Sequence, residues 1–460
     1  MLEGLEISEI RVSMLNEELR IDAEYFSKQN ISGIKRLSDF GTIKINDIAE
    51  VTDGIHTSID YDENSRINLI SAGSPKENVF DLSRNVFISE KAHKENPRTA
   101  LRKNDVIIST VGTIGNCAVV DESVLPANCD RHVGIIRIKK DYSPYVLSTF
   151  LLSKYGRLQT MRESTGNVQL NLFIYKLKEL LIPAFSKDFQ SKIESLVKSA
   201  HAKLEESKSL YAQAENLLLC ELGMLNENLS ESSKQCGGAN VSIKRFSDVF
   251  QSGRLDSEYY QKKYDRLFEI LRKKECRTLG EIVLVRKSFD PGSDAYQDEG
   301  IPFVRVSDIT KDGISETSLH LSPADFNIPE LKPKKDTILL SKDGSVGIAY
   351  KVQKDLNIFT SGALLHLTVK DKNVLPDYLT LVLNSFVVKL QAERDSNGAI
   401  IQHWRPSDVE KTLVPILPSE IQSKIASLVQ SSFVCRAESS RLLQNAKTLV
   451  EQEIEKQGEE

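Results

Sequence analysis

Two long stretches of the chain carry apolar or small residues at steps of three and four. In residues 187–222 these positions are Phe189, Ile193, Leu196, Ala200, Leu204, Ser207, Tyr211, Ala214 and Leu218. In residues 419–457 they are Ile421, Ile425, Leu428, Phe433, Leu443, Ala446, Val450 and Ile454. Neither stretch contains Pro or Gly, so the pattern predicts two long helices with a coiled-coil seam. With a rise of about 1.5 Å per residue, a helix of about 35 residues is roughly 50 Å long. A single helix of this length with one apolar seam needs a partner, and each of the two helices is the nearest candidate for the other.

Shorter apolar runs precede each long helix. They are β-branched and bounded by Gly, Asn, Asp or Pro, which predicts strands at 67–71, 105–110, 133–138, 301–305, 337–342 and 363–369. Helical stretches follow at 144–161 and 376–393, and a polar loop with glycine follows each, at 164–171 and 396–403. There is no long alternating βαβ pattern, so each half is expected to be mixed α and β.

The chain repeats itself. FQSKIESLV at 189–197 and IQSKIASLV at 421–429 agree at seven of nine positions, at an offset of 232 residues. RIDAEYF at 20–26 matches RLDSEYY at 254–260, at an offset of 234. The offset between matching segments changes by only two residues over the length of one half, which indicates that both halves share one scaffold. The chain is therefore interpreted as a tandem duplication.

These patterns predict an α+β protein with two tandem mixed α/β domains, each followed by a long helix. The expected limits are 1–186 for the first domain, 187–222 for its helix, 223–240 for a linker, 241–418 for the second domain and 419–457 for its helix. The linker is indicated by its Asn, Ser, Gly and Gln content. Antiparallel pairing of the two helices would give the chain an approximate two-fold axis.

Composition is that of an ordinary soluble protein. The 460 residues are 40% hydrophobic and 27% charged, with a net charge of −5 and a pI of about 6.0. The six cysteines form no CxxC pair, which favours reduced thiols over a disulfide or zinc site. No run of eighteen apolar residues occurs and the first residues are acidic, so neither a membrane span nor a secretory signal is predicted, and a cytoplasmic location is expected.

Sequence signatures of catalysis are missing from the chain. It has no phosphate-binding loop, no dinucleotide fingerprint, no methyl-transfer signature and no paired His/Cys ligand set. GTIG at 112–115 and GSVG at 344–347 lie between apolar runs, which favours hairpin turns over phosphate cradles. The carboxylates of Asp22 with Glu24 and of Asp256 with Glu258 could imitate a metal site, but their repetition favours a structural anchor. The chain is therefore expected not to be an enzyme.

The order of these motifs resembles the DNA-specificity subunits of type I restriction–modification systems. The resemblance rests on the two RxDxEY segments, the GxxG hairpins, the glycine loops and the helix starts at 182–193 and 414–425, and it covers essentially the whole chain. It implies two target recognition domains, each recognising one half of a bipartite site in double-stranded DNA. It also implies that the helical regions hold these domains apart and bind two methyltransferase (modification) subunits. The restriction/translocase subunits would complete the complex, and S-adenosylmethionine, Mg and ATP would be held by the partner subunits, with no cofactor on this chain.

Candidate DNA contacts fall into two chemical groups. Clustered basic residues suit the phosphate backbone, although a solvated loop face is the alternative for the stretch 84–103. The basic candidates are Arg84, Lys91, Lys94, Arg98 and Arg102 in the first half and Lys332, Lys334, Lys335 and Lys342 in the second. Amide and guanidinium groups in the glycine loops suit base edges, with turn or cap chemistry as the alternative. These candidates are Asn167, Gln169 and Asn171 in the first half and Gln402, His403 and Arg405 in the second.

Two other functions stay open on the sequence. The chain could be the recognition subunit of a type IIB-like or other phage-defence system, which the sequence cannot separate from the type I assignment. It could also be an assembly scaffold that binds protein and not DNA, which the acidic pI favours slightly and the basic loops oppose. Trp404, the single tryptophan, is expected to pack beneath its loop and not to stack on a base.

Overall fold

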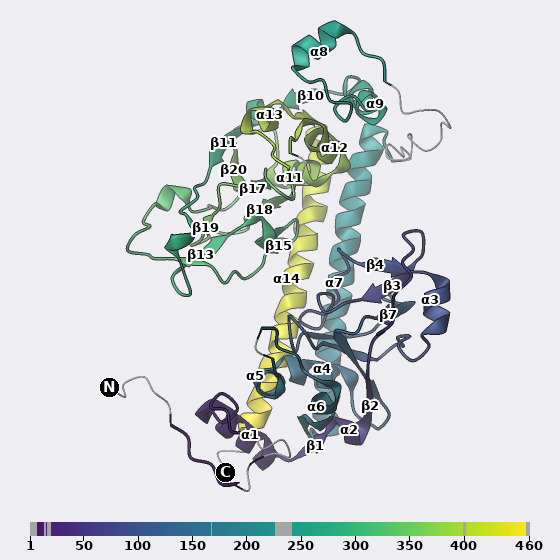
Figure 1. Ribbon diagram of the computed structural model, residues 1–460. Helices are drawn as coiled ribbons and strands as arrows, with labels where there is room; N and C mark the ends of the chain where they lie inside the picture. Colours follow the sequence, from purple (N-terminus) through teal and green to yellow (C-terminus); the bar gives the residue numbers. More distant parts are fainter. Residues whose placement is uncertain are drawn as a thin grey trace. The chain divides into compact units, whose positions relative to one another are not determined.

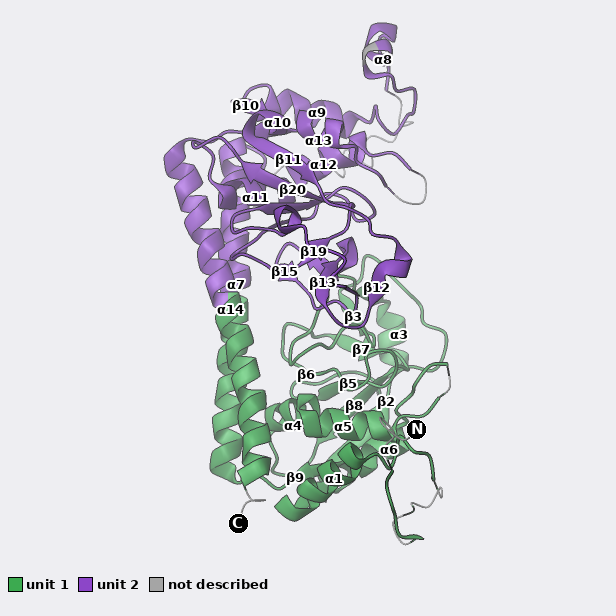
Figure 2. Cartoon of the chain, turned by 90° about the vertical axis from the view of Figure 1, so that its left-hand side faces the viewer, with its two compact units in different colours: residues 1–205, 436–460 green, residues 206–435 purple. Residues whose placement is uncertain are grey.

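The computed structural model describes residues 7–12, 15, 20–166, 168–225, 242–398 and 402–456. The chain forms two compact units (Figure 2): unit 1 comprises Met1–Glu205 and Arg436–Glu460, and unit 2 comprises Glu206–Cys435. The division falls within the two long helices and not at their ends, so each unit contains one half of each helix. Most of the expected linker, from residue 226 on, lies outside the described residues.

Unit 1 combines short strands with helices of mostly one to three turns (Figure 1). Its strands are β1 (Thr42–Lys44), β2 (Ala49–Asp53), β3 (Ile67–Ile70), β4 (Val86–Ile88), β5 (Val106–Ser109), β6 (Cys117–Val119), β7 (Ala127–Cys129), β8 (Val133–Ile138) and β9 (Leu181–Pro183). Its helices are α1 (Lys28–Phe40), α2 (Ile45–Ile48), α3 (Glu90–Glu95), α4 (Pro144–Leu152), α5 (Lys154–Glu163), α6 (Ile174–Glu179) and the first part of α7 (Lys187–Leu222). The strands form sheets of order β2-β8-β5-β6, β4-β3-β7 and β1-β9.

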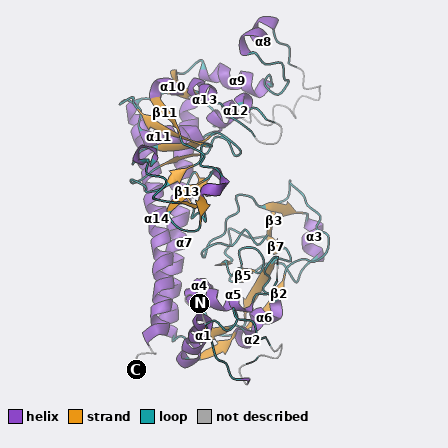
Figure 3. Ribbon diagram, turned by 60° about the vertical axis from the view of Figure 1, so that its left-hand side comes forward, coloured by secondary structure: helices purple, strands orange, loops and turns teal. Residues whose placement is uncertain are grey.

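Unit 2 repeats this arrangement (Figure 3). Its strands are β10 (Cys276–Thr278), β11 (Val283–Lys287), β12 (Tyr296–Gln297), β13 (Ile301–Val304), β14 (Ile309–Thr310), β15 (Gly313–Ile314), β16 (His320–Leu321), β17 (Ile338–Ser341), β18 (Ala349–Lys351), β19 (Phe359–Thr360), β20 (Leu364–Val369) and β21 (Leu413–Pro415). Its helices are α8 (Phe246–Ser252), α9 (Lys262–Leu271), α10 (Leu279–Ile282), α11 (Pro376–Asn384), α12 (Phe386–Asp395), α13 (Pro406–Lys411) and the first part of α14 (Ser419–Lys456). The main sheet has the order β11-β20-β17-β18, which matches β2-β8-β5-β6 of unit 1.

The main sheet of each unit is buried on both faces. In unit 1, Val106 and Ile108 of β5 point into the cluster that contains α4 and both long helices, while Ile107 points into a second cluster beneath the smaller sheet. In unit 2, Leu340 of β17 joins the larger cluster and Leu339 the smaller one. Successive side chains of a strand point to opposite faces, so burial of both faces explains why these strands are unbroken apolar runs.

The long helices complete both cores. In unit 1, Ile193 and Val197 of α7 lie in one cluster with Ala446 and Val450 of α14. In unit 2 the last part of α7 and the first part of α14 share a cluster in the same way, so the two helices run antiparallel within each unit. The predicted pair of long antiparallel helices and the mixed α/β domains are confirmed.

The seam on α14 differs from the predicted one near its middle. Ser432, Cys435 and Ser439 are buried there, although an apolar pattern passes over two of them because they are polar. The Ser432 hydroxyl donates to the backbone carbonyl of Ser207 at 2.7 Å, and the hydroxyls of Ser207 and Ser432 are 3.0 Å apart. The buried hydroxyls of Ser207 and Ser432 therefore have partners, which offsets the cost of burying them.

Each predicted helical stretch after the main sheet is two helices and not one. Ser153 separates α4 from α5 with an extended backbone (ψ 165°), and its hydroxyl accepts from the N–H of Gly156 at the start of α5. Ser385 separates α11 from α12 at the equivalent position. A serine N-cap starts a helix readily, so the apolar periodicity could continue while the axis changed direction.

Candidate nucleic-acid interface

The polar glycine loop of unit 1 closes on itself and against a hairpin. Thr165 and Asn171 exchange backbone hydrogen bonds, with N···O distances of 3.0 and 2.8 Å. The next residue, Leu172, donates its N–H to the carbonyl of Thr110, at the start of the GTIG hairpin between β5 and β6. Gly166 has a φ of 137°, and a Cβ there would lie 2.2 Å from the carbonyl oxygen of Gln169, so only glycine fits the turn.

Unit 2 builds the same junction from different side chains. Asn397 and His403 exchange backbone hydrogen bonds of 3.0 and 2.7 Å, and Trp404 donates its N–H to the carbonyl of Lys342. Gly344 of the second hairpin donates to the carbonyl of Gln402. Trp404 is fully buried beneath the loop, which confirms its predicted place. We call each closed loop with its hairpin a loop–hairpin junction (110–116 with 164–172, and 342–348 with 396–404).

The glycine pairs of both hairpins serve the turns. Gly112 and Gly115 have φ values of 72° and 81°, and Gly344 and Gly347 have 72° and 85°. The first pair lies between the antiparallel strands β5 and β6 and the second between β17 and β18. A left-handed backbone is the state that glycine adopts at little cost, so the prediction of hairpin turns is confirmed.

Strand pairing decides which candidate residues come together in unit 1. Asp53 at the end of β2 pairs with Gly134, and Ser109 at the end of β5 pairs with Val133, both near the start of β8. The loop–hairpin junction and the end of β2 therefore lie at one end of the main sheet, which we call the loop end. Arg98 also reaches this end, where it donates to the Asp53 carboxylate at 2.9 Å and to the Gly54 carbonyl at 3.1 Å.

The Asp53 carboxylate is shared between two basic groups. His56 Nε2 lies 2.5 Å from one of its oxygens, and Arg98 binds the other. Burial acts to raise the pKa of Asp53, but the hydrogen bonds from His56 and Arg98 hold it below its ordinary value. Asp53 is therefore ionised and offsets part of the charge that Arg98 brings to the loop end.

The remaining basic candidates of unit 1 are spread over its surface. Lys91 and Lys94 lie exposed on α3, and Lys94 forms an i,i+4 ion pair with Glu90 at 2.9 Å. Arg84 is exposed just before β4. Arg102 is exposed just before β5, at the opposite end of the main sheet from Arg98. The stretch 84–103 therefore does not form one edge, and its contact with phosphates stays a prediction.

The candidates of unit 2 divide in the same manner. Gln402 and His403 are exposed at the loop end, and the half-buried Lys342 there is paired with Asp343, which also binds His403 Nδ1 at 2.8 Å. Arg405 is exposed at the start of α13.

Lys332, Lys334 and Lys335 precede β17 and therefore lie at the other end of that strand. Lys332 donates to Asn357 and Lys334 to Asp355. In unit 1, Gln169 is exposed and Asn171 is half-buried in the closed loop, and Asn167 lies outside the described residues.

Sequence reasoning missed several polar residues at the loop ends. In unit 1, Arg131 is exposed, and the His132 carbonyl accepts the N–H of Thr110. In unit 2, Lys287 is exposed at the end of β11, and the Asp290 carboxylate accepts the N–H of Gly362. These residues lie far in sequence from the glycine loops, and only the pairing of distant strands brings them beside a junction.

The RxDxEY segments are structural anchors, as predicted. In unit 2, Arg254 forms an ion pair with Asp256 at 2.6 Å, and the Asp256 carboxylate accepts the N–H of Tyr259. Arg20 and Asp22 pair in the same way in unit 1, at 2.8 Å, and Asp22 accepts the N–H of Tyr25. Across the described ranges no group of three His, Cys, Asp or Glu side chains is placed to hold a metal ion. Among the same residues, no helix combines the length and apolar character that a membrane span requires.

The fold is thus a pair of tandem α/β domains with two long helices, and polar side chains lie at one end of the main sheet in each unit. The profile of the family described as "Type I restriction modification DNA specificity domain" matches residues 37–216 and 272–434. The chain therefore belongs to the family of type I restriction–modification DNA specificity subunits. Members of this family recognise DNA sequence and leave the chemistry to other subunits, so the predictions of a non-catalytic specificity subunit are confirmed and the protein-binding scaffold is not favoured.

Curated relatives and a solved structure align with most of the chain. It is 24% identical over 359 residues to the type I restriction enzyme MjaIX specificity subunit of Methanocaldococcus jannaschii, covering 75% of this chain and 74% of that protein. It is 20% identical over 430 residues to the EcoBI specificity subunit of Escherichia coli, covering 91% and 85%. The crystal structure of a type I S subunit from M. genitalium aligns over 90% of this chain and 95% of that one, with 16% identity and a TM-score of 0.41.

Proposed function

We propose that each unit recognises one half of a bipartite site in double-stranded DNA, with its loop end facing the duplex. The observation that carries this proposal is that one backbone junction occurs twice and carries different side chains. Gln169 and Asn171 offer amide groups in unit 1, whereas unit 2 combines one amide, Gln402, with the imidazole of His403 and the guanidinium of Arg405. Amides suit adenine and guanidinium suits guanine, so the two units would select different bases.

The paired helices α7 and α14 are proposed to carry the enzymatic partners. Two methyltransferase subunits would bind the helices, one for each half, and restriction/translocase subunits would join that complex. S-adenosylmethionine, Mg and ATP would be held by those partners. A duplicated scaffold supports this stoichiometry, because equivalent surfaces on two halves suit two copies of one partner.

Exchange of one domain tests the two-site model. The ends of each domain are adjacent, because Thr42 pairs with Pro183 across β1 and β9, and Cys276 pairs with Pro415 across β10 and β21. Replacing residues 42–183 by the matching segment of another family member should change one half of the methylated motif and leave the other half intact. Sequencing of methylated genomic DNA from a host that expresses the complex measures both halves at once.

The reciprocal exchange of residues 276–415 is the matched control and should change only the other half. A change of both half-sites by either exchange would contradict the two-site model. Loss of all sequence preference with intact assembly of the complex would favour the scaffold alternative.

A further inference from the structure

A tyrosine in unit 1 lies between two guanidinium groups. The Tyr25 ring centroid is 4.3 Å from Arg20 Cζ and 3.6 Å from Arg162 Cζ. The Tyr25 hydroxyl donates to the Glu163 carboxylate at 2.9 Å, and Arg162 Nε donates to the Tyr25 carbonyl at 3.1 Å. Arg20 in turn donates to the Arg162 carbonyl at 3.1 Å. The segment 20–26 is thus bound to the end of α5 by ring contacts and by hydrogen bonds in both directions.

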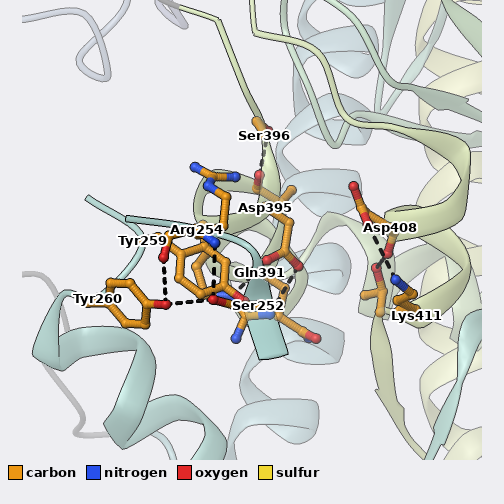
Figure 4. A network of polar contacts seen from close by, with 12 residues as sticks. Ser252, Arg254, Tyr259, Tyr260, Gln391, Asp395, Ser396, Asp408 and Lys411 are labelled. Carbon is orange, nitrogen blue, oxygen red and sulfur yellow. Dashed lines mark hydrogen bonds and ion pairs between the residues drawn. The ribbon is translucent and has the colours of Figure 1, made fainter. Parts of the chain in front are cut away.

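Unit 2 contains an equivalent arrangement (Figure 4). The Tyr259 ring centroid is 5.0 Å from Arg254 Cζ and 4.9 Å from Arg394 Cζ. Arg394 pairs with Asp395 at 2.7 Å, where Glu163 pairs with Arg162 in unit 1. We call each set the tyrosine clamp: Arg20, Tyr25, Arg162 and Glu163 in unit 1, and Arg254, Tyr259, Arg394 and Asp395 in unit 2.

Each clamp holds the residue pair that directly precedes a glycine loop. Helix α5 ends at Glu163 and the loop begins at Ser164, and helix α12 ends at Asp395 and the loop begins at Ser396. The hydroxyl of Ser164 donates to the carbonyl of Thr160, and that of Ser396 donates to the carbonyl of Ala392, so the first loop residue is bound to its helix as well.

The clamp therefore fixes one end of the loop, while the hairpin fixes the other. Leu172 is bound to Thr110 at the far end of the first loop, and Trp404 is bound to Lys342 at the far end of the second. A loop whose two ends are held loses less conformational freedom when it binds a target. The loops differ in sequence between the units, whereas both clamps keep the tyrosine and the two arginines and differ only in the carboxylate, Glu163 or Asp395.

Burial and charge keep the Tyr25 clamp in one protonation state. Burial, and then the neighbouring Glu163 carboxylate, raise the pKa of Tyr25 to about 12. The phenol therefore remains a hydrogen-bond donor throughout the range in which DNA is bound.

We propose that Tyr25 with Arg162, and Tyr259 with Arg394, are positioning residues for base recognition by the glycine loops. The inference rests on the proposed function, because it assigns the clamps a role in the specificity of loops 164–171 and 396–403. The clamps act through the loops and touch no DNA. Their role does not depend on the bases recognised, which explains why both halves keep the tyrosine, the two arginines and a carboxylate.

The test measures base discrimination at each half-site separately. The complex reconstituted with full-length chain would be assayed for binding to duplexes with the full site and to duplexes with one base pair changed in one half. Arg162→Met keeps an unbranched side chain but removes the guanidinium, and it should lower discrimination about tenfold, the scale of one good base contact, at the unit 1 half-site only. Arg394→Met should do the same at the other half-site.

Four further variants make the outcome decisive. Arg162→Lys keeps the cation over the ring and should retain most of the discrimination. Lys35→Met, an exposed site on α1, should change neither half-site. Gln169→Ala and Gln402→Ala report whether the loops recognise bases at all.

Three results would overturn the inference. If Arg162→Met lowers the melting temperature but leaves discrimination unchanged, while Gln169→Ala relaxes its half-site, the clamp is only a stabilising contact. If Arg162→Met weakens discrimination at both half-sites equally, it does not act through its own loop. If Gln169→Ala and Gln402→Ala leave base discrimination unchanged at both half-sites, the loops do not recognise bases. The proposed role of the clamps is then wrong as well.

Discussion

Equivalent residues of the two units keep their backbone contacts while their side chains change. Leu172 and Trp404 are both fully buried, and each donates its N–H to the residue that follows a central strand. Asn171 and His403 each close a loop through the same pair of backbone bonds. Backbone bonds place no demand on side-chain chemistry, so the duplicated scaffold could diverge at the exposed positions without losing its fold.

A buried histidine in unit 2 predicts a pH dependence of stability. His366 on β20 is only 5% exposed, and its Nε2 lies 2.7 Å from the Thr360 hydroxyl. Burial, and then the charge of Arg286, lower the pKa of His366 to about 4 from 6.5. The unfolded chain binds a proton near pH 6.5 and the folded chain only near pH 4. The contribution of neutral His366 to the free energy of unfolding is therefore fully present above pH 6.5. The free energy of unfolding falls by about 3 kcal/mol as the pH drops to 4.

Trp404 provides the measurement for this prediction. It is the single tryptophan and is buried in the core of unit 2, so its fluorescence follows the unfolding of that unit. Urea unfolding at pH 7.5 and pH 5 should show a smaller difference in His366→Gln than in the parent chain, because glutamine can bond to Thr360 but does not titrate. An equal pH dependence in both proteins would show that another group is responsible.

At the scale of elements, the long helices belong to the domain cores as much as to each other. Ile193 of α7 and Ile425 of α14 are equivalent in the repeat, and both are fully buried. Each lies in a cluster that also contains main-sheet strands and the other long helix. Separating the helices would therefore expose the domain cores, and the helix pair is not an independent coiled coil.

Truncation of one seam residue measures this coupling. Ile425→Ala should lower the unfolding free energy reported by Trp404 by about 2–5 kcal/mol, because it leaves a cavity in the core that contains the tryptophan. Lys424→Ala is the matched control at the neighbouring exposed position, where loss of a solvent-exposed pair with Glu420 should cost less than about 1 kcal/mol. Similar effects of the two variants would show that the seam is not part of the unit 2 core.

Local patterns predicted the elements well because each depends on its own residues. Three- and four-residue periodicity located α7 and α14, and apolar runs located β5, β8, β17 and β20. The sequence pattern did not predict the helix breaks at Ser153 and Ser385, because a capping serine leaves the apolar periodicity unchanged. The position of Lys334 relative to the glycine loop was also not predicted, because it depends on how β17 pairs with its neighbouring strands. That information lies in long-range pairing and not in the order of residues.

For the whole molecule, the duplication predicted the architecture better than any single motif did. No motif of the chain identifies a DNA-recognition protein alone, but the same sequence of strand, hairpin, glycine loop and long helix occurs twice. The candidate contacts were harder to predict, because exposure and strand order decide which polar residues share a surface. Arg98 and Arg102 are four residues apart in sequence and lie at opposite ends of one sheet.

The paired helices are expected to set the spacing between the two half-sites. Ser207 of α7 lies opposite Ser432 of α14, so antiparallel pairing places Ala200 opposite Ser439. Four helical residues inserted after Ala200 and four after Glu438 would lengthen both helices by about 6 Å while adding about one turn to each. With about 3.4 Å per base pair, the unspecified spacer should lengthen by one or two base pairs and the recognised bases should not change.

Methylation motifs of the parent and the double-insertion variant in the same host provide the comparison. Insertion into α7 alone is the control and should abolish activity, because the seam beyond the insertion loses its partner residues on α14. An active double-insertion variant with an unchanged spacer would show that the helices do not set the distance between the two recognition surfaces.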